Sequence, residues 1–256
     1  MSIEVSKADG IATVLLNRPE KHNALSEEMY HGIAHTFTEL NEDDAVRVIV
    51  FTGAGKSFCA GGDVGKMGQY DVVAGRKRSK GHQNTIKAIH QCEKPVIAAV
   101  RGACAGLGVG LALACDMVIA SETAYMMMAF KRVGIPPDGG AIYFLTQHLG
   151  IQRAKEIVYT ARRIPAAEAR ELGLVTKVVP DAELEAAALA LAREIADSAT
   201  YALRLAKRMF QYMYVPTLEM LLEMEGLAIA GARLTHDHKE GREAFMEKRP
   251  PKFLGR

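Results

Sequence analysis

The sequence predicts an α/β protein, and three observations carry that prediction. Short apolar segments of strand length alternate with segments of helical periodicity over the first half of the chain. Two of the apolar segments lead directly into glycine-rich stretches, as strands do where they enter a tight turn or a helix. Beyond Asp138 the pattern becomes mostly helical. We therefore expect a strand-rich core over residues 1–195 and a helical C-terminal region over residues 196–256.

The N-terminal elements follow from alternation and from capping residues. Residues 3–7 and 11–16 alternate apolar and polar side chains on either side of a short turn, which predicts a β-hairpin. Ser26 precedes two glutamates and a run with helical spacing, so we expect a helix to begin there. Residues 46–52 predict a buried strand. Residues 71–92 are polar and show no clear period, so no element is predicted for them.

The middle of the chain repeats strand and helix with short links. Residues 95–100 predict a strand, the glycine-rich stretch 101–116 predicts a helix, and residues 117–121 predict another strand. From residue 141 onward the apolar spacing is helical. No low-complexity linker divides the chain, so we expect the C-terminal helices to pack on the core or on a neighbouring subunit.

Composition excludes several classes of function. Hydrophobic residues make up 49% and charged residues 24% of the 256 residues, as in an ordinary globular protein. A net charge of +2 gives no electrostatic case for nucleic acid or a membrane surface. The four cysteines are scattered, and no secretory pattern is present. We expect a cytoplasmic protein with no metal site and with neither nucleic acid nor a membrane as partner.

Two glycine-rich stretches resemble nucleotide-binding motifs but fail on spacing. The sequence Gly55-Lys56-Ser57 would belong to a phosphate loop only if a glycine stood at position 50, where the chain has Val50. The stretch from Gly106 to Gly110 lacks the third glycine of the dinucleotide fingerprint. Neither a nucleoside-triphosphate site nor a dinucleotide site is therefore expected.

The same two stretches share a setting that suits a different chemistry. Each follows a predicted buried strand, at residues 53–63 and 101–113, and brings backbone amides to a turn where a ligand can approach closely. Two backbone N–H groups that converge on one oxygen form an oxyanion hole, which stabilises an enolate. Alternatively, the glycines only permit close packing of strand and helix. Spacing alone does not decide between these interpretations.

Four stretches together resemble the crotonase superfamily, the enoyl-CoA hydratase/isomerase family. They are LNRPEKHNALS (16–26), FCAGGD (58–63), AVRGACAGLGVGLALACD (99–116) and GREAFMEKRPPKF (241–253). The resemblance covers nearly the whole chain. It implies a core built as a spiral of ββα units, with a helical C-terminal region that forms a homotrimer or a dimer of trimers. It also implies an acyl-CoA thioester substrate, so coenzyme A is part of the substrate and no separate cofactor is expected.

The resemblance also implies roles for particular residues. The two amides of the oxyanion hole fall on Gly62 and Leu107. The backbone near Ala24 and Ala60 would contact the nucleotide and pantetheine parts of coenzyme A.

Two further positions match a C-terminal Phe-x-x-Lys pattern of the family. Phe245 and Lys248 would reach a part of coenzyme A, often across a subunit interface. An ammonium group is a suitable partner for a phosphate. The alternative for Lys248 is an exposed lysine on a helix with no such role.

The count of carboxylates favours an isomerase over a hydratase. Family hydratases use two glutamates, and these positions are Gly110 and Phe130 in this sequence. The resemblance is closest to the single-aspartate isomerases of the phenylacetate-degradation type, in which Asp138 would be the base and Phe130 would border the substrate. One carboxylate suffices to remove an α or γ proton and to return it at the other carbon, thereby shifting the double bond. The alternative for Asp138 is to cap the helix that follows it.

Three other activities remain open from the sequence. The protein could be an enoyl-CoA hydratase, or an acyl-CoA hydrolase in which Asp138 is a nucleophile. The hydrolase would need a second group to activate water, and the sequence does not place His90 well enough to assign it. The third alternative is an inactive acyl-CoA-binding scaffold. No acyl-chain preference is predicted, because residues 71–92 are expected to border the pocket.

Overall fold

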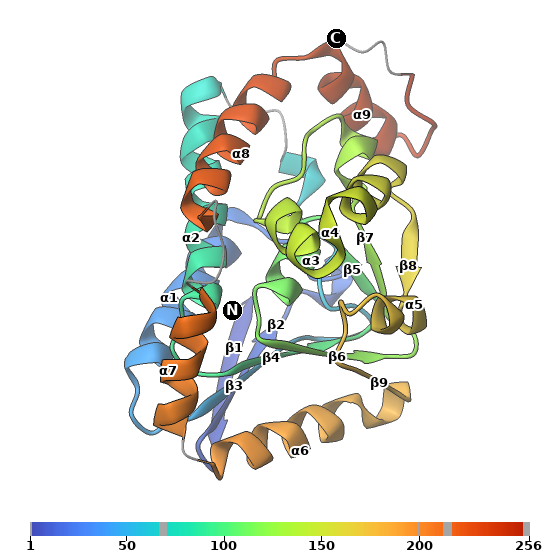
Figure 1. Cartoon of the computed structure of the whole chain (residues 1–256). Helices are drawn as coiled ribbons and strands as arrows, with labels where there is room; N and C mark the ends of the chain where they lie inside the picture. The colour runs from blue at the N-terminus through green and yellow to red at the C-terminus, as the bar shows by residue number, and fades with distance from the viewer. Residues whose placement is uncertain (1, 67–70, 199, 212–216, 253–256) are drawn as a thin grey trace.

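The structure, a computed structural model, describes the whole chain except residues 1, 67–70, 199, 212–216 and 253–256. It combines a main β-sheet, a small second sheet and helices that cover them (Figure 1). The strands are β1 (Ile3–Ala8), β2 (Ile11–Leu16), β3 (Val48–Gly53), β4 (Val96–Val100), β5 (Ala103–Ala105), β6 (Met117–Ser121), β7 (Tyr125–Met127), β8 (Arg163–Pro165) and β9 (Lys177–Val179).

Helices account for most of the remaining chain. The α-helices are α1 (Glu27–Glu42), α2 (Val72–His90), α3 (Leu107–Leu113), α4 (Ala141–Thr160), α5 (Ala166–Glu171), α6 (Leu184–Ala196), α7 (Thr200–Gln211), α8 (Leu218–Ala232) and α9 (His236–Met246). Short 3-10 helices are η1 (Pro19–Lys21), η2 (Val64–Lys66), η3 (Ala129–Val133) and η4 (Asp181–Glu183).

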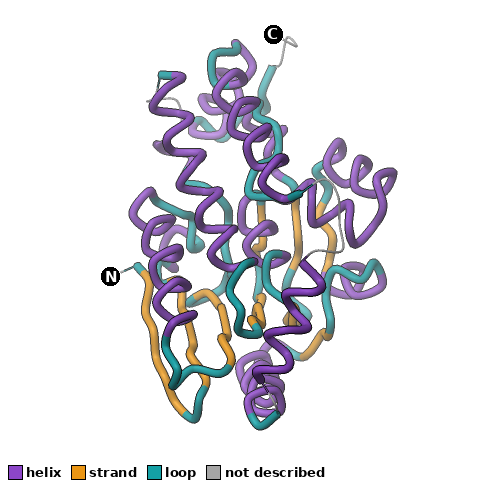
Figure 2. Tube along the Cα trace, turned by 60° about the vertical axis from the view of Figure 1, so that its left-hand side comes forward, coloured by secondary structure: helices purple, strands orange, loops and turns teal. Residues whose placement is uncertain are grey.

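The main sheet has the strand order β1-β2-β3-β4-β6-β9. Only the N-terminal hairpin, β1 with β2, is antiparallel, and all the other pairs in this sheet are parallel. The second sheet has the order β5-β7-β8. The tube view in Figure 2 shows strands at the lower left, near the N-terminus, and again to the right of centre, with helices between and above them. The predicted α/β class is confirmed.

Helices cover both faces of the main sheet, and the sequence of β3 shows why. Its side chains alternate between two clusters of buried residues, as the period of a strand requires. Val48 and Val50 pack with α6, whereas Phe51 lies on the other face against α1. There the rings of Phe51 and Phe37 meet edge to face with centroids 5.4 Å apart. Burying such a ring contributes roughly 1.5–3 kcal/mol.

Most predicted elements are confirmed within a few residues. The hairpin and α1 are present, and the Ser26 hydroxyl accepts a hydrogen bond from the backbone N–H of Met29 at 3.3 Å. Lys56, from the rejected phosphate-loop pattern, is exposed in the turn after β3. None of the helices in the described part of the chain is long and apolar enough to cross a membrane.

The largest departure from the sequence prediction is α2. The stretch that showed no period is a helix of 19 residues, capped by Asp71, whose carboxylate accepts a hydrogen bond from Ala74 N–H at 2.8 Å. Its buried face consists largely of small or polar residues, which hides the helical period from any hydrophobicity pattern. These residues include Gly75, Arg78, Ser79, Gly81, His82, Gln83 and Thr85.

The C-terminal helices contact the core in different places. Helix α6 lies across one face of the main sheet, α8 packs against α2, and α9 packs against η3. Figure 1 shows α2 and α8 side by side along one edge of the molecule. The predicted boundary between residues 195 and 196 coincides with the end of α6, but a division into two units stays a prediction.

Candidate active site

Hydrogen bonds from Arg18 hold the first family-like stretch against the second. Its Nη1 donates to the carbonyl of Ala24 at 2.9 Å and forms an ion pair with Asp63 Oδ2 at 2.9 Å. The Arg18 guanidinium thus connects the loop before α1 to the loop after β3. Because Arg18 is held by Asp63, its hydrogen bond to the Ala24 carbonyl also fixes the orientation of the backbone at Ala24.

Asn23 and His22 complete this connection. The buried side chain of Asn23 donates to the carbonyl oxygens of Ser57 at 2.7 Å and Ala54 at 3.0 Å. The backbone N–H of Ala60 donates to the carbonyl of His22 at 3.0 Å. The structure therefore brings the segments of Ala24 and Ala60 together, and their contact with coenzyme A stays a prediction.

The backbone N–H of Gly62 points away from the Leu25 segment with which Gly62 forms a β-bridge. Leu25 N–H donates to Gly61 O at 2.8 Å, and Asp63 N–H donates to Leu25 O at 3.0 Å. In a parallel bridge of this register, the N–H of the central residue, Gly62, points to the opposite side. Gly61 has φ of +100°, which favours glycine, and a β-carbon there would lie 2.9 Å from Ala105 O.

Leu107 begins α3 beside this glycine loop. A β-carbon on Gly61 would lie only 3.6 Å from Leu107 N, so the two chains run in close contact. As the first residue of a helix, Leu107 has no intrahelical partner for its N–H. Within the described part of the chain, no hydrogen bond uses the N–H of Gly62 or Leu107. Two unused amides on adjacent segments are what an oxyanion hole requires.

Asp138 lies in the loop between η3 and α4, next to Leu107. Its side chain is 11% exposed, and a β-carbon on the following residue, Gly139, would overlap the side chain of Leu107. The N-cap of α4 is Gly140, and no side chain caps this helix. The alternative in which Asp138 caps the following helix is therefore wrong. The double glycine, with φ of +65° and +70°, instead separates the carboxylate from the helix start.

The closest polar partner of Asp138 is a histidine from α2. His82 Nδ1 lies 3.2 Å from Asp138 Oδ2, and the imidazole is 4% exposed. The ring of Tyr30, from α1, stacks on His82 with centroids 3.9 Å apart. Burial lowers the pKa of His82, against the opposing effect of its contact with Asp138. Burial and the charge of Asp138 raise the pKa of the Tyr30 hydroxyl.

Sequence reasoning missed His82 and considered His90 in its place. The signal that could have found it is weak: Asp71 as an N-cap, followed by Gly75, Ser79 and His82 at helical spacing. His90, two turns later on α2, instead lies against the ring of Phe144 with centroids 5.4 Å apart.

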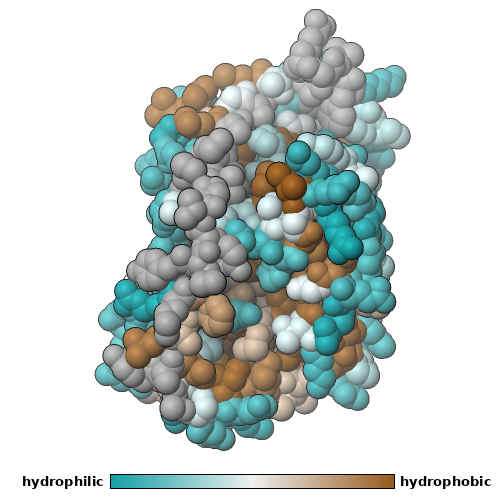
Figure 3. All heavy atoms as spheres, viewed as in Figure 1, coloured by the Kyte–Doolittle hydropathy of each residue, from teal (hydrophilic) through white to brown (hydrophobic). Residues whose placement is uncertain are grey.

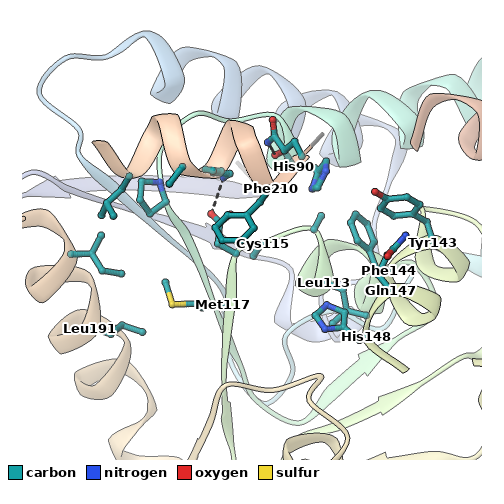
Figure 4. A pocket seen from close by; sticks show the side chains of 18 residues that line it. His90, Leu113, Cys115, Met117, Tyr143, Phe144, Gln147, His148, Leu191 and Phe210 are labelled. Atoms are coloured by element: carbon teal, nitrogen blue, oxygen red, sulfur yellow. Dashed lines mark hydrogen bonds and ion pairs between the residues drawn. The ribbon is translucent and has the colours of Figure 1, made fainter. Parts of the chain in front are cut away.

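His90 borders a separate cavity of about 640 Å³ (Figure 4). The cavity lies among the end of α3, the start of β6, and helices α4, α6 and α7. Hydrophobic residues gather in the lower part of the face drawn in Figure 3, between the positions of α6 and α7. None of the predicted site residues lines this cavity, and its polar rim contains the ion pair of Lys207 Nζ with Asp116 Oδ2 at 2.7 Å.

Neither position of the family's hydratase glutamates holds a carboxylate, and Gly110 has no room for one. A β-carbon on Gly110 would overlap the carbonyl oxygen of Gly139, so a larger residue there would displace the Asp138 loop. Phe130 is buried, and its ring lies 3.8 Å from where a β-carbon on Gly106 would stand. The ring thus lies at the start of α3, and its role in bordering the substrate stays a prediction.

The predicted C-terminal contacts lie apart from these loops. The side chain of Phe245, near the end of α9, is 56% exposed, and Lys248 follows in an exposed left-handed turn with φ of +55°. Among the described residues, no hydrogen bond or ring contact joins either side chain to the Asp138 region. Their contact with coenzyme A stays a prediction.

Comparison with known proteins shows which family the chain belongs to. The sequence model described as "Enoyl-CoA hydratase/isomerase" matches residues 6–256. A "Probable enoyl-CoA hydratase" of Rhodobacter capsulatus is 35% identical over 255 residues, covering 100% of this chain and 98% of that protein. The "1,2-epoxyphenylacetyl-CoA isomerase" of Escherichia coli is 34% identical, covering 96% of each chain.

Solved structures agree with the sequence matches. The crystal structure of an enoyl-CoA hydratase from Mycobacterium avium subsp. paratuberculosis superposes with a TM-score of 0.92 at 32% identity, covering 99% of both chains. An enoyl-CoA hydratase/isomerase from Pseudoalteromonas atlantica superposes with a TM-score of 0.90 at 31% identity, covering 99% of this chain and 100% of that one. The relatives thus include proteins named as hydratases and one named as an isomerase.

Proposed function

Since the chain belongs to the enoyl-CoA hydratase/isomerase family, we propose that it shifts a carbon–carbon double bond in an enoyl-CoA thioester. Processing of acyl-CoA is common to the family, and the choice of isomerisation rests on the residues of this chain. In this proposal Asp138 is the base, and the amides of Gly62 and Leu107 bind the thioester oxygen.

The observation that carries the proposal is the environment of Asp138. Among carboxylates whose burial the structure describes, Asp138 alone is buried. Its Oδ1 is enclosed and has no hydrogen-bond partner in the described part of the chain. The positions that hold glutamates in family hydratases are Gly110 and Phe130, and the packing of Gly110 against Gly139 leaves no room for a carboxylate there. A single base fits isomerisation better than addition of water.

The reaction needs only proton transfer and charge stabilisation. Asp138 Oδ1 removes a proton from the α or γ carbon of the substrate, and the electrons move into a dienolate on the thioester oxygen. The N–H groups of Gly62 and Leu107 donate to that oxygen, in a region from which water is largely excluded. The carboxylic acid then returns the proton at the other end of the dienolate. The double bond has moved, and the enzyme is unchanged.

Binding of coenzyme A is proposed to use both the core and the C-terminal region. The adjoining backbone segments at Ala24 and Ala60 would contact its nucleotide and pantetheine parts. Phe245 and Lys248 are exposed, which supports a role in reaching coenzyme A from a neighbouring subunit. We propose a homotrimer or a dimer of trimers, supported by exposed apolar residues on the C-terminal helices and in the turn between α8 and α9: Phe210, Leu227, Leu234, Phe245 and Met246.

The decisive experiment compares 3-enoyl-CoA with 2-enoyl-CoA as substrates and separates the products by liquid chromatography. The wild-type protein should interconvert the two, and Asp138→Asn should lower kcat about a thousandfold. Asp44→Asn, the same change at an exposed position, should have no effect. Activity that survives in Asp138→Asn contradicts the assignment of the base. Efficient water addition, or binding of CoA without turnover, contradicts isomerisation.

The contact of His82 with Asp138 favours acyl-CoA hydrolysis as a second candidate. The Asp138 carboxylate would attack the thioester carbonyl, the C–S bond would break, and the CoA thiolate would leave and take a proton from solvent. Water would then attack the resulting anhydride and lose a proton to His82 Nε2, releasing the acid and restoring Asp138. A thiol reagent measures this directly, because hydrolysis releases free CoA whereas isomerisation does not.

A further inference from the structure

Three elements distant in the sequence meet around His82. The histidine comes from α2, Tyr30 comes from α1, and Asp138 comes from the loop before α4. Both side chains of the His82–Asp138 pair are almost completely enclosed, and Tyr30 covers one face of the imidazole at 3.9 Å. The imidazole therefore has little freedom to turn away from the carboxylate.

The donors and acceptors of His82 and Asp138 determine which of the two side chains carries the proton in their hydrogen bond. An ionised carboxylate only accepts hydrogen bonds, and a neutral imidazole has one N–H and one acceptor nitrogen. His82 Nδ1 faces Asp138 Oδ2, so Nδ1 carries the proton and donates it. Both Nε2 of His82 and Oδ1 of Asp138 then remain without a hydrogen-bond partner among the described residues.

The charged groups around His82 favour this neutral tautomer. Arg78 on α2 and Arg233, which follows α8, act on the imidazole with positive charge, and burial acts in the same direction to lower its pKa. Asp138 is the opposing group. The Tyr30 hydroxyl, whose pKa is raised by burial, is uncharged at neutral pH. The Cys59 thiol near Tyr30 also stays uncharged, because burial raises its pKa to about 12.

We propose that His82 is a positioning residue for the reaction: it holds Oδ2 of Asp138 by a hydrogen bond and leaves Oδ1 as the single atom that moves the proton. This inference rests on the proposed isomerase function. A hydrogen bond to the charged form of a carboxylate favours that form. A fixed carboxylate also removes the rotational freedom that would otherwise place Oδ1 out of reach of the substrate carbon.

The test uses two substitutions of His82 and one matched control. His82→Phe keeps a flat ring against Tyr30 but removes the donor. His82→Asn places an amide N–H near the position of Nδ1 and retains the donor. His35→Phe makes the same change as the first variant at an exposed position of α1. Thermal unfolding of each variant establishes that it is folded.

Two measurements follow for each variant. In His82→Phe, kcat for isomerisation should fall at least about tenfold with KM within about twofold, and the acid limb of the kcat profile should move up by about one pH unit. Carbon-13 NMR of the Asp138 carboxyl, assigned with Asp138→Asn, should show the same upward shift. In His82→Asn, kcat and the Asp138 titration should return most of the way to their wild-type values. In His35→Phe, they should be unchanged.

An unchanged acid limb and an unchanged Asp138 titration in folded His82→Phe would overturn the proposal. Equal losses in the Phe and Asn variants would also overturn it, because a merely packed ring would not distinguish them. If His82→Phe does not fold, His82→Gln replaces it, since its amide lies near Nε2 and cannot donate to Oδ2. The NMR titration needs no substrate, so a wild type that does not isomerise enoyl-CoA refutes the proposed function separately.

Discussion

At its first residue, Leu107, α3 lies against the glycine loop and the loop that carries Asp138, whereas its last residue, Leu113, borders an apolar cavity. The two ends are six positions apart in the sequence, roughly 9 Å along the helix axis. Each end has a histidine from α2 with a lowered pKa, the buried His82 at one and the half-buried His90 at the other. Only His82 contacts a carboxylate.

The larger of these two places is therefore not the candidate active site. The cavity at the Leu113 end is large and mostly apolar, but none of its lining residues belongs to the family-like stretch 58–63, which includes Gly62. The Leu107 end combines unused backbone amides with a buried carboxylate that has an unpaired oxygen. Chemistry needs convergent polar groups, and these occur at the crowded end.

After Asp138→Asn, the substitution expected to have the largest effect on activity and stability is Gly110→Ala, near the Leu107 end of α3. The added β-carbon overlaps Gly139 O, so the loop that carries Asp138 must move. We expect a loss of about 2–4 kcal/mol in the free energy of unfolding, measured in urea, and loss of isomerisation. Gly231→Ala on α8 is the matched control, because its β-carbon meets nothing within 4 Å. Normal activity in Gly110→Ala would contradict the close packing of the Asp138 loop on α3.

A change at the cavity end should affect stability without affecting chemistry. Lys207→Met removes the cation that pairs with Asp116 and donates to Lys94 O at 2.9 Å. The free energy of unfolding should fall by about 1–3 kcal/mol, because Asp116 loses a partly buried partner. Steady-state kcat and KM should stay within about twofold of wild type. Lys239→Met, an exposed helical lysine, is the control, and a large fall in kcat would give the cavity a catalytic role.

The pH dependence of stability should include histidines at both ends of α3. Three buried or half-buried histidines have a pKa lowered by burial from the ordinary 6.5, so below pH 6.5 the unfolded chain binds protons that the folded chain does not. The free energy of unfolding therefore falls as pH decreases from 6.5, by at most about 1.4 kcal/mol per pH unit for each histidine. They are His82, His90 and His238.

Urea unfolding at pH 7.5, 6.5 and 5.5 checks this. His90→Phe should flatten the dependence by one histidine's share, because the titrating group at the cavity end is gone. His35→Phe, at an exposed position, should leave the dependence as in wild type. Equal slopes in the two variants would mean that His90 does not titrate differently on folding.

The smallest effect is expected far from both ends of α3. Lys248→Ala should raise KM for an enoyl-CoA by a few-fold and leave kcat unchanged, because the proposed contact of its ammonium group with a CoA phosphate would be lost. Lys252→Ala, the same change at a neighbouring exposed lysine, is the control. If KM is equal in both variants, the predicted contact of Lys248 with coenzyme A is wrong.

Sequence patterns predicted the secondary-structure elements whose buried faces are apolar, and they did not predict the helix whose buried face is largely polar. The alternation in β3 and the cap at Ser26 were readable, because hydrophobic period and capping chemistry are local. Helix α2 was not readable, since glycine, serine, arginine, glutamine and histidine form its buried face. His82 was lost with it. The same helix lies against α1, and its His82 reaches Asp138, so the polar burial that hid the helix is part of the candidate site.

By itself, the sequence determined the α/β class, the two glycine-rich turns after strands, and the absence of carboxylates at positions 110 and 130. These follow from local patterns and from residue identity. Only the tertiary structure decided that Gly61 lies against Leu107 and that Asp138 contacts His82 instead of capping α4. The His82–Asp138 contact joins residues 56 positions apart, and it exists because buried polar groups must find partners wherever the packed elements place them.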